Sequence, residues 1–194
     1  MQDWNEIRAW RKATRARLLA ERQQLSAAER DAIGERVRAG VFSLLGNTLP
    51  GSLGLYWPIH GELNLVPVAD AVLAAGGRVG LPVVVQKAAP VEFWSWRRGE
   101  RLVRGQWDIP VPKHRDVVTP ELLIVPLVGF DAAGYRLGYG GGFYDRTLAA
   151  SVPRPRTIGV GFASAQLDSI FPQPHDVPLD VLVTERGIIE RGKP

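Results

Sequence analysis

Residues 126–146 read PLVGFDAAGYRLGYGGGFYDR, and no other segment says as much about the architecture of this chain. The apolar run over residues 122–128 predicts a buried strand, which leads through a turn into a loop where four of the five positions 138–142 are glycine. A short helix is expected to begin near Gly142. A strand, a glycine-rich loop and a helix in this order are typical of α/β folds whose loops bind phosphate.

Three other segments have the pattern of helices. Residues 5–22 predict a basic helix and residues 66–75 a short one. Ser26 and Glu29 form a capping box, which opens a further helix that should stop near Gly46. Short apolar runs predict strands over residues 53–57, 79–85, 91–96, 122–128, 157–162 and 181–184. Because strands and helices alternate, we predict an α/β fold: a three-layer single domain, residues 1–194, with a mostly parallel sheet flanked by helices.

The composition excludes several classes of site and of location. The chain has no cysteine, which removes disulfides, thiolate zinc sites and cysteine nucleophiles. No apolar run is long enough for a membrane helix, and the first residues are polar and basic, so we expect a cytoplasmic protein without a membrane partner. The net charge of +4 comes from 24 basic against 20 acidic residues, and nearly all the basic residues are arginine. It fits an anionic ligand, and it also fits a simple compositional bias.

The glycine-rich loop carries the clearest chemistry. Gly138, Gly140, Gly141 and Gly142 let backbone N–H groups approach an anion and adopt positive φ angles, and the following helix adds its positive end, so the loop is predicted to bind phosphate. Arg136 could bind a phosphoryl oxygen, and Asp145 is placed to bind magnesium beside the phosphates. Taken singly, Arg136 also fits a surface ion pair and Asp145 a partner of the helix dipole. No Gly-Lys-Ser/Thr follows, so this is not a P-loop.

The whole segment resembles the signature of the 5-formyltetrahydrofolate cyclo-ligase family (methenyltetrahydrofolate synthetases), an Arg-Leu-Gly-x-Gly-x-Gly-Tyr/Phe-Tyr-Asp run that follows such a strand. Weaker similarities extend over most of the chain, among them Gly61-Glu62, Trp107-Asp108-Ile109-Pro110 and Pro178 to Val183. The resemblance implies an enzyme that uses ATP and a divalent metal, Mg²⁺, to cyclise 5-formyltetrahydrofolate to 5,10-methenyltetrahydrofolate, with release of ADP and phosphate. The formyl oxygen would be activated by transfer of the γ-phosphoryl group.

The resemblance also implies roles for individual residues. Arg136 and Asp145 would be catalytic, and Asp145 and Asp180 would bind the metal. The ATP-binding set would be Arg11, Arg15, Arg136, Gly138, Gly140, Gly141, Gly142 and Tyr144. The folate-binding set would be Trp57, Glu62, Trp107, Tyr139 and Phe143. At position 11 the family has lysine, so the contact made by the planar guanidinium of Arg11 would differ in geometry.

Two other functions are compatible with these residues. Another α/β enzyme could use the same loop to hold a sugar phosphate or an acyl carrier without ATP. A nucleic-acid-binding module would explain the basic first helix and the pI near 9.8, but the basic residues are dispersed and do not form the concentrated stripe of an RNA binder. We therefore expect a reduced folate and ATP as partners, no nucleic acid, and a monomer.

Overall fold

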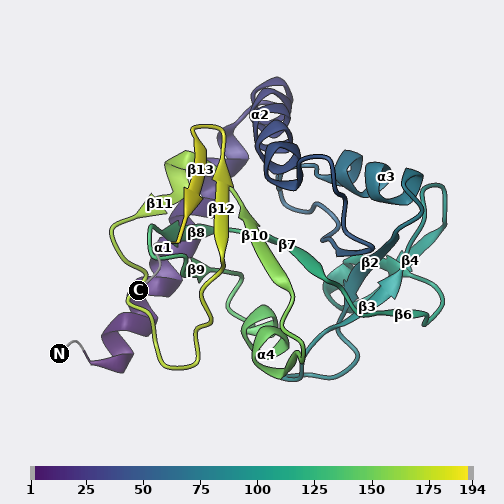
Figure 1. The fold of residues 1–194 in the computed structure, drawn as a ribbon. Coiled ribbons are helices and arrows are strands. Elements are labelled where there is room, and N and C mark those ends of the chain that lie inside the picture. Colours follow the sequence, from purple (N-terminus) through teal and green to yellow (C-terminus); the bar gives the residue numbers. More distant parts are fainter. Residues whose placement is uncertain (1–2, 192–194) are drawn as a thin grey trace.

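The computed structural model describes residues 3–191 and contains four α-helices among them (Figure 1). The helices are α1 (Trp4–Gln24), α2 (Ala27–Leu45), α3 (Val66–Ala74) and α4 (Phe143–Ala150). The large sheet consists, from edge to edge, of β13 (Gly187–Glu190), β12 (Val181–Thr184), β10 (Arg156–Val160), β7 (Leu122–Pro126), β1 (Ser52–Gly54), β2 (Arg78–Val83), β3 (Glu92–Ser95) and β6 (Val117–Val118). Two small sheets are formed by β11 (Gln166–Leu167), β8 (Gly129–Asp131) and β9 (Arg136–Leu137), and by β4 (Leu102–Arg104) and β5 (Pro110–Pro112).

The middle of the large sheet is parallel. β12, β10, β7, β1 and β2 run in one direction, whereas β13 pairs antiparallel with β12 at one edge. At the other edge β3 pairs antiparallel with β2, and β6 pairs antiparallel with β3. This confirms the predicted mostly parallel sheet. The small sheets and the edge strands β6 and β13 were not predicted, because most of them are only two to four residues long and carry no clear alternation.

Helices cover both faces of the sheet, as predicted for three layers. Along β7, Leu122 and Ile124 join the cluster beneath α2 and α3, while Leu123 and Val125 join the cluster that contains residues of α1 and α4. Both sets are buried because successive side chains of a strand point to opposite faces and each face has its own cover. A central strand that is apolar at every position is therefore what the run 122–126 should form.

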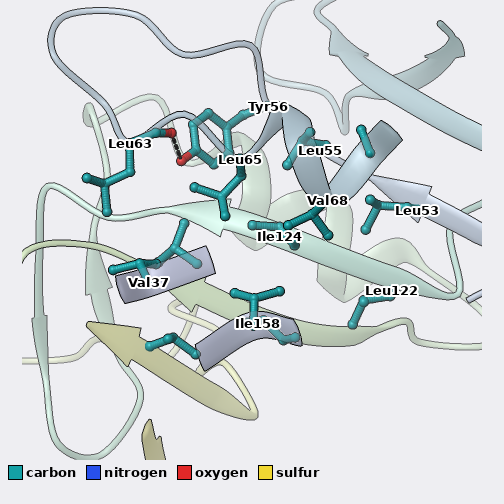
Figure 2. Close-up of a cluster of buried hydrophobic side chains, with 14 of the residues drawn as sticks. Val37, Leu53, Leu55, Tyr56, Leu63, Leu65, Val68, Leu122, Ile124 and Ile158 are labelled. Atoms are coloured by element: carbon teal, nitrogen blue, oxygen red, sulfur yellow. Dashed lines mark hydrogen bonds between the residues drawn. The ribbon is translucent and has the colours of Figure 1, made fainter. Parts of the chain in front are cut away.

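Figure 2 shows the first of these clusters around Val37 of α2, Val68 of α3 and Ile124 of β7. All three are fully or almost fully buried, and burying an aliphatic side chain of this size contributes about 1.5–3 kcal/mol each. The buried Tyr56 hydroxyl donates to the Leu63 carbonyl at 2.6 Å, which closes the loop that follows β1. The strand was predicted to continue to Trp57, but β1 ends at Gly54 and residues 55–57 belong to this loop.

Short polar contacts set the ends of the elements. The capping box predicted at Ser26 is present: Ser26 accepts from the Glu29 backbone at 3.2 Å, and the Glu29 side chain accepts from the Ser26 backbone at 2.8 Å. The buried Asp131 carboxylate accepts from Ala133 and Tyr135 and holds the turn between β8 and β9. Gly134 in this turn has φ +87° and lies against the Leu179 carbonyl, where a side chain would not fit. This turn delivers Arg136 to the site.

The connections of β1 and β7 leave the sheet on opposite sides. The chain passes from β1 through α3, on one face, to β2, and from β7 through α4, on the other face, to β10. Neighbouring parallel strands that diverge in this way leave a crevice at their carboxyl ends, which is where open α/β sheets bind ligands. The loops after β1 and β7 therefore face each other across the expected site.

Candidate functional site

A cleft of about 860 Å³ opens at this crevice. It is lined by every residue for which the sequence predicted a role except Asp180, namely Arg11, Arg15, Trp57, Glu62, Trp107, Arg136, Gly138, Tyr139, Gly140, Gly141, Gly142, Phe143, Tyr144 and Asp145. They come from α1, the loop after β1, the segment before β5, the glycine-rich loop and α4. The fold thus gathers residues that are far apart along the chain.

The glycine-rich loop exposes its N–H groups and uses its carbonyl groups for support. Gly138 accepts from Arg15 Nε at 2.8 Å, and Gly141 accepts from Arg146 Nη2 at 2.6 Å. Across the part of the chain that the structure describes, no backbone or side-chain acceptor takes the N–H groups of residues 138–142. Buried or semi-enclosed N–H groups are normally paired, so a row of free ones bordering a cleft is suited to an anionic ligand.

Two glycines in this loop are required by the backbone and one is not. Gly140 has φ +94°, and Gly142, the N-cap of α4, has φ +63°, both in the region that favours glycine. Gly138 has no positive φ, and no atom lies within 4 Å of the point where a Cβ would stand, so the protein itself leaves room for a side chain there. The open space beside Gly138 belongs to the cleft.

The two predicted arginines of α1 differ in their surroundings. Arg11 is buried, and its guanidinium donates to the carbonyls of Ile170 and Phe171 and to Asp176, with 2.6 Å between Nη2 and Oδ2. Arg15 uses only Nε, which leaves Nη1 and Nη2 without an acceptor among residues 3–191. Partial burial, and then the charge of Arg11, lower the pKa of Arg15, so an additional negative group beside it would be favourable.

Arg136 and Asp145, which flank the glycine-rich loop in the sequence and line the cleft, form an ion pair. Arg136 Nη2 lies 3.0 Å from Asp145 Oδ1, and Arg136 Nη1 donates to the Val177 carbonyl at 2.7 Å. The Arg136 side chain is only 4% exposed, so it is a buried cation and not half of a surface ion pair. Asp145 Oδ1 also accepts from the Val177 N–H, whereas Oδ2 accepts no hydrogen bond within residues 3–191.

Asp180 does not join the other predicted residues. Its Oδ2 accepts from the backbone and hydroxyl of Thr157 at 2.8 and 2.7 Å, which ties the start of β12 to β10. The predicted metal role of Asp180 therefore has no support from its position. The acidic residue that does line the cleft near Asp145 is Asp176, which directly precedes Val177. Burial would raise the pKa of Asp176, but hydrogen bonds from Arg11 and Gln173 lower it overall.

Glu62 lines the same cleft and contacts Tyr139, which lies between Gly138 and Gly140. Its Oε2 accepts from the Ile59 N–H at 3.0 Å, and its Oε1 accepts from the Tyr139 hydroxyl at 2.9 Å. Loss of water around the carboxylate raises the pKa of Glu62 to about 7, and the two hydrogen bonds and Arg22 limit the rise. A carboxylate held from behind by two donors keeps its remaining lone pairs for a ligand.

Aromatic side chains also line the cleft. Trp57 is half-buried and meets Trp96 edge-on at 5.7 Å between ring centroids. Trp107 is 61% exposed and meets Phe143 edge-on at 5.6 Å. Burial raises the pKa of Tyr144, so its hydroxyl stays a neutral donor. Flat apolar walls above a carboxylate suit a planar heterocycle that carries N–H groups.

Sequence reasoning missed several residues of the cleft. Asp176 and His175 lie in a proline-rich segment whose composition predicts only a surface loop, and Arg8 lies one turn before Arg11 on α1. Spacing held a signal for Arg8, since positions 4, 8, 11 and 15 share one helix face. No local pattern pointed to Asp176.

Among residues 3–191, no group of three or more His, Asp or Glu side chains could hold a metal by itself. No helix in that part of the chain is long and apolar enough to cross a membrane.

The chain is similar in sequence and fold to the proteins of one family. A model of the 5-formyltetrahydrofolate cyclo-ligase family matches residues 7–185. The chain is 33% identical to the 5-formyltetrahydrofolate cyclo-ligase of Mycolicibacterium smegmatis, over 90% of this chain and 94% of the relative, and 32% identical to that of Escherichia coli, over 87% and 97%. The NMR structure of Aquifex aeolicus 5,10-methenyltetrahydrofolate synthetase superposes with a TM-score of 0.80 at 30% identity, over 95% of this chain and 94% of that one.

Proposed function

Because the chain belongs to the 5-formyltetrahydrofolate cyclo-ligase family, we propose that it converts 5-formyltetrahydrofolate and ATP to 5,10-methenyltetrahydrofolate, ADP and phosphate. One structural observation carries this assignment beyond membership of the family. The free N–H groups of residues 138–142 and the half-buried carboxylate of Glu62 border one cleft. An anionic phosphate chain and a pterin that donates hydrogen bonds need these two surfaces.

The chemistry needs two bond exchanges. The formyl oxygen attacks the γ-phosphorus of ATP, an O–P bond forms, and the bond from the γ-phosphorus to its bridging oxygen breaks as ADP leaves. N10 of the folate then attacks the activated formyl carbon and gives up its proton to solvent. The C–O bond breaks, and phosphate departs. No covalent bond to the protein is required, so the work of the chain is to position the reactants and stabilise charge.

At the phosphate end the chain supplies fixed donors. The N–H groups of the glycine-rich loop and the free Nη1 and Nη2 of Arg15 would bind the phosphate oxygens. The sequence assigned the same task to Arg11 and Arg136, but both are engaged within the protein, so their part is to hold Asp176 and Asp145 in place. Because these donors are already oriented, little free energy is spent on reorganising them when the phosphates bind. They can therefore stabilise the charge on the phosphoryl group during its transfer.

A magnesium ion fits the residues at this end. Asp145 Oδ2 accepts no hydrogen bond among residues 3–191, and Asp176, which precedes the Val177 whose N–H binds Asp145 Oδ1, lines the same cleft. With only two carboxylates nearby, the phosphates of the nucleotide and water would complete the coordination, as is usual for Mg²⁺. When bound, the ion would neutralise charge on the phosphates. We propose Asp145 and Asp176 as its ligands, in place of the predicted pair Asp145 and Asp180.

At the folate end, Glu62 would accept from the N–H groups of the pterin ring, and Trp57, Trp107 and Phe143 would enclose the ring system. Tyr139 would act through Glu62, to which its hydroxyl is bound. We further propose that residues 1–194 act as one domain, as a cytoplasmic monomer without a nucleic-acid partner.

The test is a spectrophotometric assay of the purified protein. We expect the methenyl product to form from 5-formyltetrahydrofolate only when ATP and Mg²⁺ are both present, with one ADP released per product molecule. Product formation without ATP, or no product in protein that is shown to be folded by circular dichroism, would contradict the proposal. RNA binding whose affinity falls steeply as salt rises would favour the nucleic-acid alternative, whereas no binding of single-stranded RNA even at low salt would argue against it.

A further inference from the structure

Arg22, near the end of α1, has an unusual position for a cation. The residue is 6% exposed, and its Nε is the one buried side-chain nitrogen or oxygen among residues 3–191 that has no hydrogen-bond partner. Its Nη2 donates to the Tyr139 hydroxyl at 3.2 Å, and the guanidinium carbon lies 6.0 Å from the centre of the Tyr139 ring. Burying an incompletely paired guanidinium costs stability, so its retention calls for a compensating role.

The contacts of Arg22 continue into the site. The Tyr139 hydroxyl accepts from Arg22 and donates to Glu62 Oε1 at 2.9 Å, so its single proton is directed at the carboxylate. The Ile59 N–H holds the other oxygen, Oε2, at 3.0 Å. Two successive hydrogen bonds thus connect the Arg22 guanidinium, the Tyr139 hydroxyl and the Glu62 carboxylate. They link α1 through the glycine-rich loop to the folate end of the cleft.

The charged and titratable groups around Glu62 single out Arg22. Tyr56, Tyr139 and Tyr144 face the carboxylate and are neutral at neutral pH, because burial raises the pKa of each. Arg30 of α2 reaches the same turn near Gly61, but its guanidinium donates to the Leu25 carbonyl. His60 lies with its ring 6.2 Å from that of Tyr139. Of the groups that shift the pKa of Glu62, Arg22 is the cation.

We propose that Arg22 and Tyr139 are positioning residues for folate binding, which hold the Glu62 carboxylate ionised and turned toward the pterin ring. The inference rests on the proposed function, since it takes Glu62 as the group that binds the folate. The inference adds that folate affinity depends on the charge of Arg22, whereas ATP affinity does not. Arg22 is part of α1 and is linked to the Glu62 carboxylate through the Tyr139 hydroxyl.

The predicted pH dependence follows from the sign of each effect. An ionised carboxylate can accept both pterin hydrogens, so the KM for the folate should rise as pH falls through the pKa of Glu62, near 7. Arg22 and the Tyr139 hydroxyl both lower that pKa. Removing either one should therefore move the midpoint of the folate KM profile to higher pH, and weaken folate binding at neutral pH.

The experiment compares the KM for the folate and the KM for ATP from about pH 5.5 to about pH 9 in the wild type, Tyr139→Phe, Arg22→Met and Arg22→Lys. We expect a midpoint about one pH unit higher in Tyr139→Phe and Arg22→Met, and about a fivefold higher folate KM at pH 7, because the ionised fraction of Glu62 falls from about a half to about a tenth. The ATP KM should stay within about twofold of the wild type, and Arg22→Lys should recover part of the loss. Titration of the substrates is common to all variants and cancels in the comparison.

Two controls make the outcome decisive. His60→Gln should leave the midpoint in place, and a shift there as large as that of Tyr139→Phe would assign the titration to His60 and overturn the proposal. Tyr139→Phe retains the ring and the loop backbone, so it serves even if Arg22→Met does not fold. Unchanged midpoints in a protein that still cyclises the folate would refute this inference alone, whereas a wild type without that activity would refute the proposed function.

Discussion

The two ends of the cleft bind by different means. The phosphate end relies on backbone N–H groups that one continuous loop supplies, whereas the folate end relies on the Glu62 side chain, which Ile59, Tyr139 and Arg22 support. Backbone donors need only glycine and a turn, and they remain in place whatever the pH. A half-buried carboxylate needs partners from separate elements, and the loss of water around Glu62 raises its pKa to about 7. The first end should therefore be sensitive to loop geometry and the second to pH.

The largest effect should come from Asp145→Asn, which removes the free carboxylate oxygen of the phosphate end. We expect kcat to fall by about 10²–10³. The protein should also lose some stability, because the buried Arg136 loses its charged partner. Asp180→Asn is the matched control, and should keep kcat within about twofold while it weakens the contact to Thr157. A kcat loss in Asp180→Asn as large as that in Asp145→Asn would show that Asp180 belongs to the active site.

The next largest effects are expected at the two arginines of α1, because Arg15 is proposed to bind ATP and Arg11 to support the fold. Arg15→Ala should raise the ATP KM by about 10–100-fold at nearly unchanged thermal stability, because its free guanidinium nitrogens serve only the ligand. Arg11→Ala should instead cost about 3–5 kcal/mol of unfolding free energy, since it leaves the largely buried Asp176 unpaired. Urea denaturation with steady-state kinetics measures both. The reverse assignment of losses would show that Arg11 is the phosphate ligand.

A smaller effect is expected from single methyl groups in the glycine-rich loop. Gly138→Ala should leave the melting temperature unchanged and raise the ATP KM about fivefold to tenfold, because the added methyl enters only the cleft. Gly140→Ala should also lower stability by about 1–2 kcal/mol, because alanine is strained at φ +94°. If Gly138→Ala binds ATP as well as the wild type, the nucleotide does not approach this backbone.

The smallest effect is a gain in stability at the folate end. The raised pKa of Glu62 means that the folded protein holds a proton which the unfolded chain releases, so wild-type stability falls between about pH 4.5 and about pH 7 and stays lower above that. Glu62→Gln should therefore melt about 2–4 °C higher than the wild type at pH 8, and at the same temperature near pH 4. A constant difference across this range would show that Glu62 keeps an ordinary pKa.

The same contrast explains what could be predicted from the sequence. Most of the phosphate end lies within residues 136–145, so its glycines, Arg136 and Asp145 could be identified together from a local pattern, and all of them line the cleft. The central strands were predictable for the same reason, since each is a continuous apolar run. Their ends were less so: residues 55–57 continue the apolar run after β1 has ended.

Residues whose roles depend on long-range contacts were harder to foresee. Arg11 matched the family position for a phosphate contact, but its burial against Asp176 arises only when the segment near residue 176 folds back on α1. Asp180 and Asp176 are four positions apart in a proline-rich segment, and only the fold decides which one faces the cleft. Arg22 resembles any basic residue of an amphipathic helix until Tyr139 is placed beside it.

The most direct test of phosphate binding at the glycine-rich loop follows the backbone amides of Gly138, Gly140, Gly141 and Gly142 by NMR in isotope-labelled protein titrated with MgATP. We predict that these amide resonances shift and saturate together at the nucleotide concentration that saturates turnover, with smaller changes at Ile59 and Glu62. Saturable nucleotide binding that leaves the glycine amides unmoved would contradict this prediction, because the phosphates would then lie elsewhere.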